Sequence, residues 1–197
     1  MSDRITVRSK PIAGCREKVK RFVDEGWTEV YDKAPMTNPG RLSQHDLLVA
    51  AAIGAGSPSQ SQMLQMWRRK EEVDRALAAI PKDADLLSDR VPWQELEALF
   101  AAFLKSKGYG ISRTSKVLHK KLPGLVPLMD NEVVIGRYFK EFEGCVGSKD
   151  AEEAIGLIRA IRTEVLREKA TVSRLREEVA PDLSLLRIWD ILLQPRV

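Results

Sequence analysis

The chain has 197 residues, of which 44% are hydrophobic and 30% charged, and its formal net charge at pH 7 is +4. This composition is typical of a globular protein and excludes the low-hydropathy profile of an intrinsically disordered chain. A chain of this length buries enough apolar surface to fold without disulfides or metals, so we expect a single domain over residues 1–197.

Neither the cysteines nor the histidines indicate a metal site. Cys15 and Cys145 form no CxxC pair, so we expect buried free thiols. His45 and His119 have no ligand-like partner at metal spacing, and we expect no metal and no cofactor. No signal peptide is evident, and the longest apolar stretch (47–55) is too short to span a bilayer, which predicts a cytoplasmic protein without a membrane partner.

The first half of the chain has helical periodicity. Apolar residues at helical spacing predict a short amphipathic helix over 16–27, and the Pro-, Asn- and Gly-rich segment 32–42 should be a loop. Ser43 followed by Asp46 predicts a capped helix start. The segment 59–80 reads as one long helix.

Three large side chains in that long helix, Met63, Met66 and Trp67, allow two interpretations. Core filling is the simpler one, because Met adapts well to irregular gaps in an apolar interior. Stacking on a ligand is the alternative.

The second half is also helical, and the fold class we expect is all-α. No stretch has a convincing period-2 strand pattern, and Ile5 to Val7 is the single candidate. The further expected elements are a connector over 81–92, a helix from Pro92 to the cations before Gly108, a helical segment over 131–142, a helix opened by Asp150, and a last helix that starts at Pro181 and Asp182.

The positive charge is concentrated in one place. No Asp or Glu occurs from Ala98 to Met129, whereas that stretch contains six Lys and Arg. Subtracting +6 from the total of +4 leaves the rest of the chain at −2. The stretch includes YGISRTSKVLHKKLPGLVPLMD (109–130), whose only acid is its last residue, Asp130.

A turn before the helix in this segment predicts an anion site. Gly108 and Gly110 relax the backbone, and Ser112 is placed to cap the helix that follows. A tight turn that enters a helix leaves amide hydrogens pointing outward, and the helix dipole favours an anion there.

The helix after the turn should have one basic face. At about 100° per residue, Arg113, Lys116, His119 and Lys120 fall within an arc of about 120°. A helix that packs by one face and presents cations on the other matches the footprint of a phosphate-backbone reader. Simple solubilising surface charge is the alternative.

Four segments in one order resemble an uncharacterised bacterial domain family of unknown function, frequent in actinobacteria. They are LSQHDLLVAAAIGA, IPKDADLLS, YGISRTSKVLHKKLPGLVPLMDNEVV and DLSLLRIWDILL, and the resemblance covers about residues 28–193. The family implies no established activity.

A local resemblance concerns residues 108–139. YGISRTSKVL followed by LVPLMDNEVV is similar to the helix-hairpin-helix element of base-excision DNA glycosylases. In that superfamily the hairpin amides hold a DNA phosphate, the damaged base is flipped into a pocket, and an aspartate stabilises cationic character on the sugar or activates the nucleophile. The resemblance places Gly110 and Ile111 in the hairpin, Ser112 at its second glycine, and Asp130 at the aspartate.

Two departures limit what this resemblance implies. Ser112 replaces a glycine, and Thr114 stands where lyase-type members carry the Schiff-base lysine. Lys116 lies two residues further on, half a turn or more around the helix. Asp130 also has an ordinary structural interpretation, because a carboxylate just before a helix is a common N-cap.

Three functions therefore remain open. The leading hypothesis is nucleic-acid binding through the basic element, with DNA as the expected partner and RNA as the open alternative. The second is a glycosylase-like enzyme that uses Asp130 as its catalytic residue, and the third is an interaction module without a nucleic-acid role. The residues expected to bind nucleic acid are Gly110, Ser112, Arg113, Lys116, His119 and Lys120.

Overall fold

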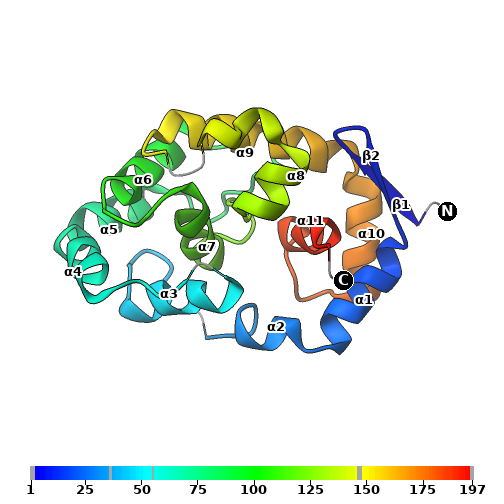
Figure 1. Cartoon of the computed structure of the whole chain (residues 1–197), viewed down its shortest axis with the longest axis horizontal. Helices are drawn as coiled ribbons and strands as arrows, with labels where there is room; N and C mark the ends of the chain where they lie inside the picture. Colours follow the sequence, from blue (N-terminus) through cyan, green and yellow to red (C-terminus); the bar gives the residue numbers. More distant parts are fainter. Residues whose placement is uncertain (1–2, 36, 55, 146–147, 196–197) are drawn as a thin grey trace.

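The computed structural model describes residues 3–35, 37–54, 56–145 and 148–195. Helices pack around a continuous core, and the prediction of an all-α fold is confirmed apart from one small antiparallel hairpin (Figure 1). The hairpin pairs β1 (Arg4–Val7) with β2 (Lys10–Ala13) and places Ile5 opposite Ile12. The sequence indicated the first strand but not its partner.

The helices of the first half follow the expected order. They are α1 (Cys15–Asp24), α2 (Trp27–Val30), α3 (Gln44–Val49), the 3-10 helix η1 (Ala50–Ile53), α4 (Gln60–Arg68), α5 (Lys70–Ala79) and α6 (Trp93–Leu104).

The second half begins with α7 and ends with a helix that docks in the core. Its elements are α7 (Ile111–Lys121), the π-helix η2 (Asn131–Ile135), α8 (Gly136–Tyr138), the 3-10 helix η3 (Lys140–Cys145), α9 (Ala151–Arg167), α10 (Lys169–Val179) and α11 (Leu185–Leu193).

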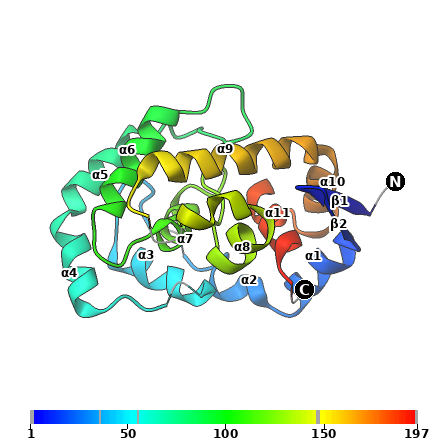
Figure 2. The same cartoon turned by 45° about the horizontal axis from the view of Figure 1, so that its top comes forward.

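The elements gather at two ends of the molecule, with α7 between them. The helices α1, α10 and α11 contact one another beside the hairpin and both chain ends, whereas α3 to α6 form the opposite end (Figure 1). The long helix α9 runs along the molecule and contacts both α6 and α10 (Figure 2). Because α7 packs against α3, η1 and α6, most of its surface faces protein.

Several local predictions are confirmed. Ser43 and Asp46 form a reciprocal capping box at the start of α3. Asp150 caps α9 by accepting the amide hydrogen of Glu152 at 2.9 Å. Both cysteines are free and buried.

Two helix boundaries differ from the prediction. The segment 59–80 is split at Arg69, whose backbone leaves the helical region and whose Nε donates to the carbonyl of Ala102 at 3.4 Å. The last helix begins after Ser184 rather than at Pro181 and Asp182, because the Ser184 hydroxyl accepts the amide hydrogen of Arg187.

Candidate nucleic-acid interface

The turn between α6 and α7, residues 105–110, is shaped by two glycines. Gly108 has φ +80°, which favours glycine, and Gly110 is the N-cap residue of α7. No side chain caps this helix, and its first backbone bond is donated by Thr114 to the carbonyl of Gly110. The predicted cap role of Ser112 is therefore wrong, because the helix begins one residue before it.

The N-terminus of α7 leaves donors open. Among the described residues, the amides of Ile111 and Ser112 have no recorded acceptor. Such amides and the positive end of the helix dipole favour an anion. Gly110 and Ser112 are partly accessible, whereas Ile111 is buried, so the amide of Ser112 is the one at this position that solvent can reach.

Cations from three segments surround the turn. Lys149 Nζ donates to the carbonyls of Ser106 and Tyr109, at 2.6 and 3.2 Å. Arg113 Nη1 donates to the carbonyl of Gly108 at 2.7 Å. Lys105 is exposed and bridges to Glu72, and Lys107 is exposed beside it. We call Lys105, Lys107, Arg113 and Lys149 the tip cations.

The remaining cations of α7 do not form an exposed face. Lys116 and His119 are only 3% and 2% exposed, so the prediction that they lie on an exposed face is wrong. Lys120 is half-buried, and its Nζ donates to the carbonyls of Tyr31 and Asp32, each at 2.9 Å. The physical reason is that the chain before α3 covers this side of α7.

Lys121 anchors the loop before α3. Its Nζ lies 2.6 Å from Asp46 Oδ2 with both side chains buried, and it donates to the carbonyls of Asn38 and Arg41 at 2.9 and 2.8 Å. A buried charge needs such partners, because an unpaired one is costly. The charge thereby fixes the position of residues 38–41.

His119 is held neutral inside the protein. Its Nδ1–H donates to the carbonyl of Val126 at 2.6 Å, and its ring stacks on Tyr31 at a centroid distance of 6.1 Å. Burial, reinforced by the charge of Arg187, lowers the pKa of His119 to about 3. A neutral imidazole inside the core does not contribute to an exposed basic face.

Asp130 acts as a helix cap and an ion-pair partner. Its Oδ1 accepts the amide hydrogens of Glu132 and Val133 at 3.0 Å, and its Oδ2 lies 2.8 Å from Lys116 Nζ. Burial raises the pKa of the Asp130 carboxyl, but the bonds from Lys116 and the two amides outweigh burial and lower it overall. The carboxylate is 28% exposed and therefore reaches solvent at one side.

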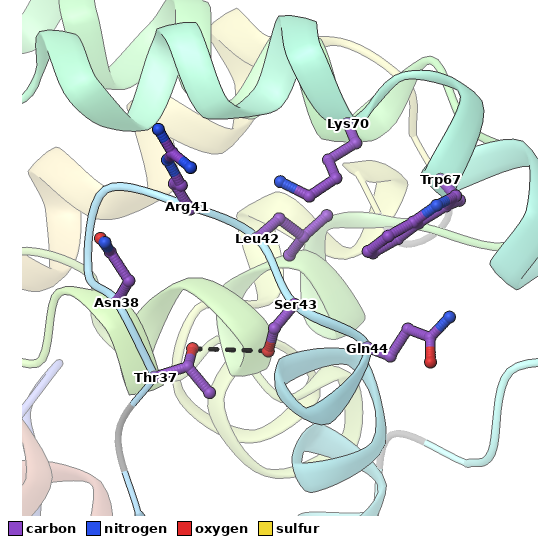
Figure 3. A pocket seen from close by; sticks show the side chains of 8 residues that line it. All are labelled: Thr37, Asn38, Arg41, Leu42, Ser43, Gln44, Trp67 and Lys70. Carbon is purple, nitrogen blue, oxygen red and sulfur yellow. Dashed lines mark hydrogen bonds between the residues drawn. The ribbon is translucent and has the colours of Figure 1, made fainter.

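A hollow of about 530 Å³ lies beside the loop before α3 (Figure 3). Trp67 stands at one side of it, and Asn38 and Arg41 stand at the other. We call it the Trp67 hollow; its lining residues are Thr37, Asn38, Arg41, Leu42, Ser43, Gln44, Trp67 and Lys70.

Trp67 is not part of the core. Its residue is 40% exposed, whereas the neighbouring Met66 is fully buried. Core filling is therefore correct for Met66 and wrong for Trp67. The exposure of Trp67 could have been inferred from its polar neighbours on α4, because Gln62, Gln65 and Arg68 alternate with the apolar residues there.

Sequence reasoning also missed Lys149 as a neighbour of the turn, because it lies 36 positions after Arg113 and in a segment that looks like a simple break. In the described part of the chain, no group of three or more His, Cys, Asp or Glu side chains is arranged to hold a metal ion. Within the same residues, no helix is both long and apolar enough to cross a membrane.

Comparison with known families finds a match over most of the chain. The model of a family of unknown function (DUF6308) matches residues 18–196. No curated protein and no solved structure matches the chain.

Proposed function

The chain belongs to DUF6308, a family of unknown function, and we propose that it binds nucleic acid by holding a backbone phosphate at the α6–α7 turn. The observation that carries the proposal is the convergence of the tip cations, from three separate segments, on one turn. The open and partly accessible amide of Ser112 lies at the same turn. Amides and cations together are the donors that phosphate oxygens accept from.

The charge of the surroundings supports this assignment. Glu72 is the acid that pairs with Lys105, and it also pairs with Arg69, so cations outnumber acids at the turn. Lys149 and Arg113 donate hydrogen bonds to the carbonyl oxygens of the turn. These oxygens would otherwise repel a phosphate, and their coverage leaves the Ser112 amide and the exposed lysines as the groups that meet an incoming anion.

DNA is the nucleic acid we propose, on the strength of the local resemblance to helix-hairpin-helix proteins. The base-excision alternative gains no support from the geometry of Asp130. Its two oxygens serve the cap of η2 and the pair with Lys116, and Asp130 does not line the Trp67 hollow.

Lys107→Glu tests the phosphate site. Lys107 is exposed and its side chain has no recorded internal bond, so the substitution changes charge without disturbing packing. Lys116 is unsuitable for this test, because it is buried and its substitution would disturb the fold as well as the charge. Fluorescence anisotropy with a labelled duplex and a labelled single strand, at several salt concentrations, gives the affinity and its salt dependence.

We expect Lys107→Glu to weaken binding about tenfold and to reduce the slope of log K against log salt by about 1. Lys20→Glu is the matched control, since Lys20 is exposed on α1 at the opposite end of the molecule (Figure 1). Equal losses in the two variants, or no salt-dependent binding by the wild-type protein, would contradict the proposal. Equal binding of polyglutamate would favour an acidic protein partner instead.

A further inference from the structure

We infer that the Trp67 hollow receives an unpaired nucleobase of the same nucleic acid, with the Trp67 ring as its stacking platform. This inference rests on the proposed function and adds to it: the ligand should contain single-stranded or unpaired nucleotides rather than duplex alone. The hollow has a size within the range of small-ligand sites, about 300–1,000 Å³.

The exposure of Trp67 is the first observation. Burial of an aromatic ring of this size is favourable, and an exposed one next to a cavity commonly marks a binding surface. A second hollow of about 210 Å³ shares Trp67 and Gln44 with the first and is otherwise lined by Leu47, Met63 and Leu64. Trp67 therefore contributes to the lining of both hollows.

The polar lining is the second observation, and it contains no carboxylate. Arg41 and Lys70 are its cations, and Asn38 and Gln44 provide amides with both donors and acceptors. Lys70 Nζ lies 5.6 Å from the centroid of the Trp67 ring. An aromatic plane, amides and cations are the groups that contact the face, the edge and the phosphate of a nucleotide, respectively.

The acids near the hollow are already engaged. Asp46 is buried and receives bonds from Lys121, Ser43 and Thr37. Asp74 pairs with Lys70 and accepts the amide hydrogen of Leu42 at 2.7 Å. In the described residues, the Arg41 side chain is exposed and has no recorded acidic partner, so the surface of the hollow favours an anionic ligand.

Helix α4 connects the hollow to the α6–α7 turn. Gln62 accepts a hydrogen bond from Arg113 at 3.3 Å, and Gln65 accepts the amide hydrogen of Lys107 at 3.3 Å. Trp67 follows on the same helix, five residues after Gln62, which corresponds to roughly 7.5 Å along the axis. Five residues also correspond to a rotation of about 140° around the helix, so Gln62 and Trp67 point to different sides of α4. A strand that contacts both the turn and the hollow therefore has to pass around this helix.

Trp67→Leu tests the inference, with Trp67→Phe as the variant that keeps an aromatic platform. Trp27→Leu is the matched control, because Trp27 is 59% exposed on α2 and lines neither hollow. The probes are a labelled oligothymidylate of about 12 nucleotides, within the site sizes of single-strand binders, and an abasic strand of the same length. Thermal unfolding of each variant checks that it folds.

We expect Trp67→Leu to weaken binding of oligothymidylate about tenfold, with near wild-type binding for Trp67→Phe and Trp27→Leu. The abasic strand should bind the wild-type protein more weakly than oligothymidylate and should be insensitive to Trp67→Leu.

The outcomes separate this inference from the proposed function. If Lys107→Glu weakens binding but Trp67→Leu behaves like Trp27→Leu, or if both strands bind equally, the base site is overturned and the phosphate site stands. If the wild-type protein binds neither strand, both are overturned. Binding of polyglutamate that depends on Trp67 would assign the hollow to an acidic protein segment and overturn the nucleobase assignment.

Discussion

The buried neutral His119 should make the folded protein less stable as the pH falls. Because burial lowers its pKa to about 3, the folded protein does not take up a proton on His119 between pH 6.5 and about pH 3, whereas the unfolded chain does. The unfolded state therefore binds more protons in this window. The contribution of His119 to stability is complete above pH 6.5 and declines as the pH falls below it.

The variant His119→Asn should lose this pH dependence. Asn places an amide donor near the position of Nδ1, which preserves the bond to Val126. Between pH 7.5 and 5.0 we expect the wild-type free energy of unfolding to fall by about 2 kcal/mol more than that of the variant. Urea denaturation at the two pH values measures the difference. His45→Asn, at an exposed position, should behave like wild type, and an unchanged pH dependence in His119→Asn would refute the assignment.

Lys116, Lys120 and Lys121 illustrate why residue type alone does not establish a binding face. Each has its amino group bonded to an internal acceptor: Lys116 to Asp130, Lys120 to two carbonyls, and Lys121 to Asp46. Their charges stabilise the arrangement of α7, the loop before α3 and η2. These three lysines therefore contribute no exposed basic face on α7.

At the scale of elements, the conformation of the α6–α7 turn depends on Gly108 and on the contact of Gln62 with Arg113. Gly108 has φ +80°, and a Cβ atom built on it would lie 1.9 Å from Gln62 Nε2. The Gln62 side chain can move away from an added Cβ atom, but this movement does not remove the strain of a left-handed backbone at residue 108. Displacement of Gln62 would also break its bond with Arg113 and separate α4 from the turn.

Gly108→Ala should therefore affect both stability and binding. We expect a loss of about 1–2 kcal/mol in the free energy of unfolding from the left-handed backbone. Nucleic-acid affinity should also fall, because the tip cations are held by this turn. Gly144→Ala is the control, since Gly144 is exposed, has an ordinary φ and has no atom within 4 Å of its built Cβ. Equal unfolding midpoints for the two variants would contradict the account.

The caps were predictable because they depend on neighbouring residues. Ser43 with Asp46, and Asp150, are recognisable from short spacing alone. The break at Arg69 was not predictable, because the partner that draws its side chain away is Ala102, on another helix. The burial of Lys116 and His119 was missed for the same reason: a helical wheel shows which residues share a face but not what covers that face.

At the scale of the whole molecule, the helical class follows from periodicity, while the functional surface depends on long-range packing. Lys149 reaches the turn from the segment before α9, and Trp67 is exposed because Met66 takes the core position beside it. The Trp67 hollow is lined from α3, α4, α5 and the loop before α3, and the tip cations lie on the α6–α7 turn, on α7 and before α9. The helices α3 to α6 form one end of the molecule (Figure 1). The hairpin and chain ends lie at the opposite end.

An amide and indole NMR titration of the full chain with an unlabelled single-stranded oligonucleotide tests the location of binding most directly. We predict that the largest shift changes occur at the amides of Ile111, Ser112 and Arg113 and at the indole N–H of Trp67. The indole N–H of Trp27 and the amides of α1 should remain unperturbed. Shift changes concentrated at α1 and α2, or none at saturating oligonucleotide, would contradict it.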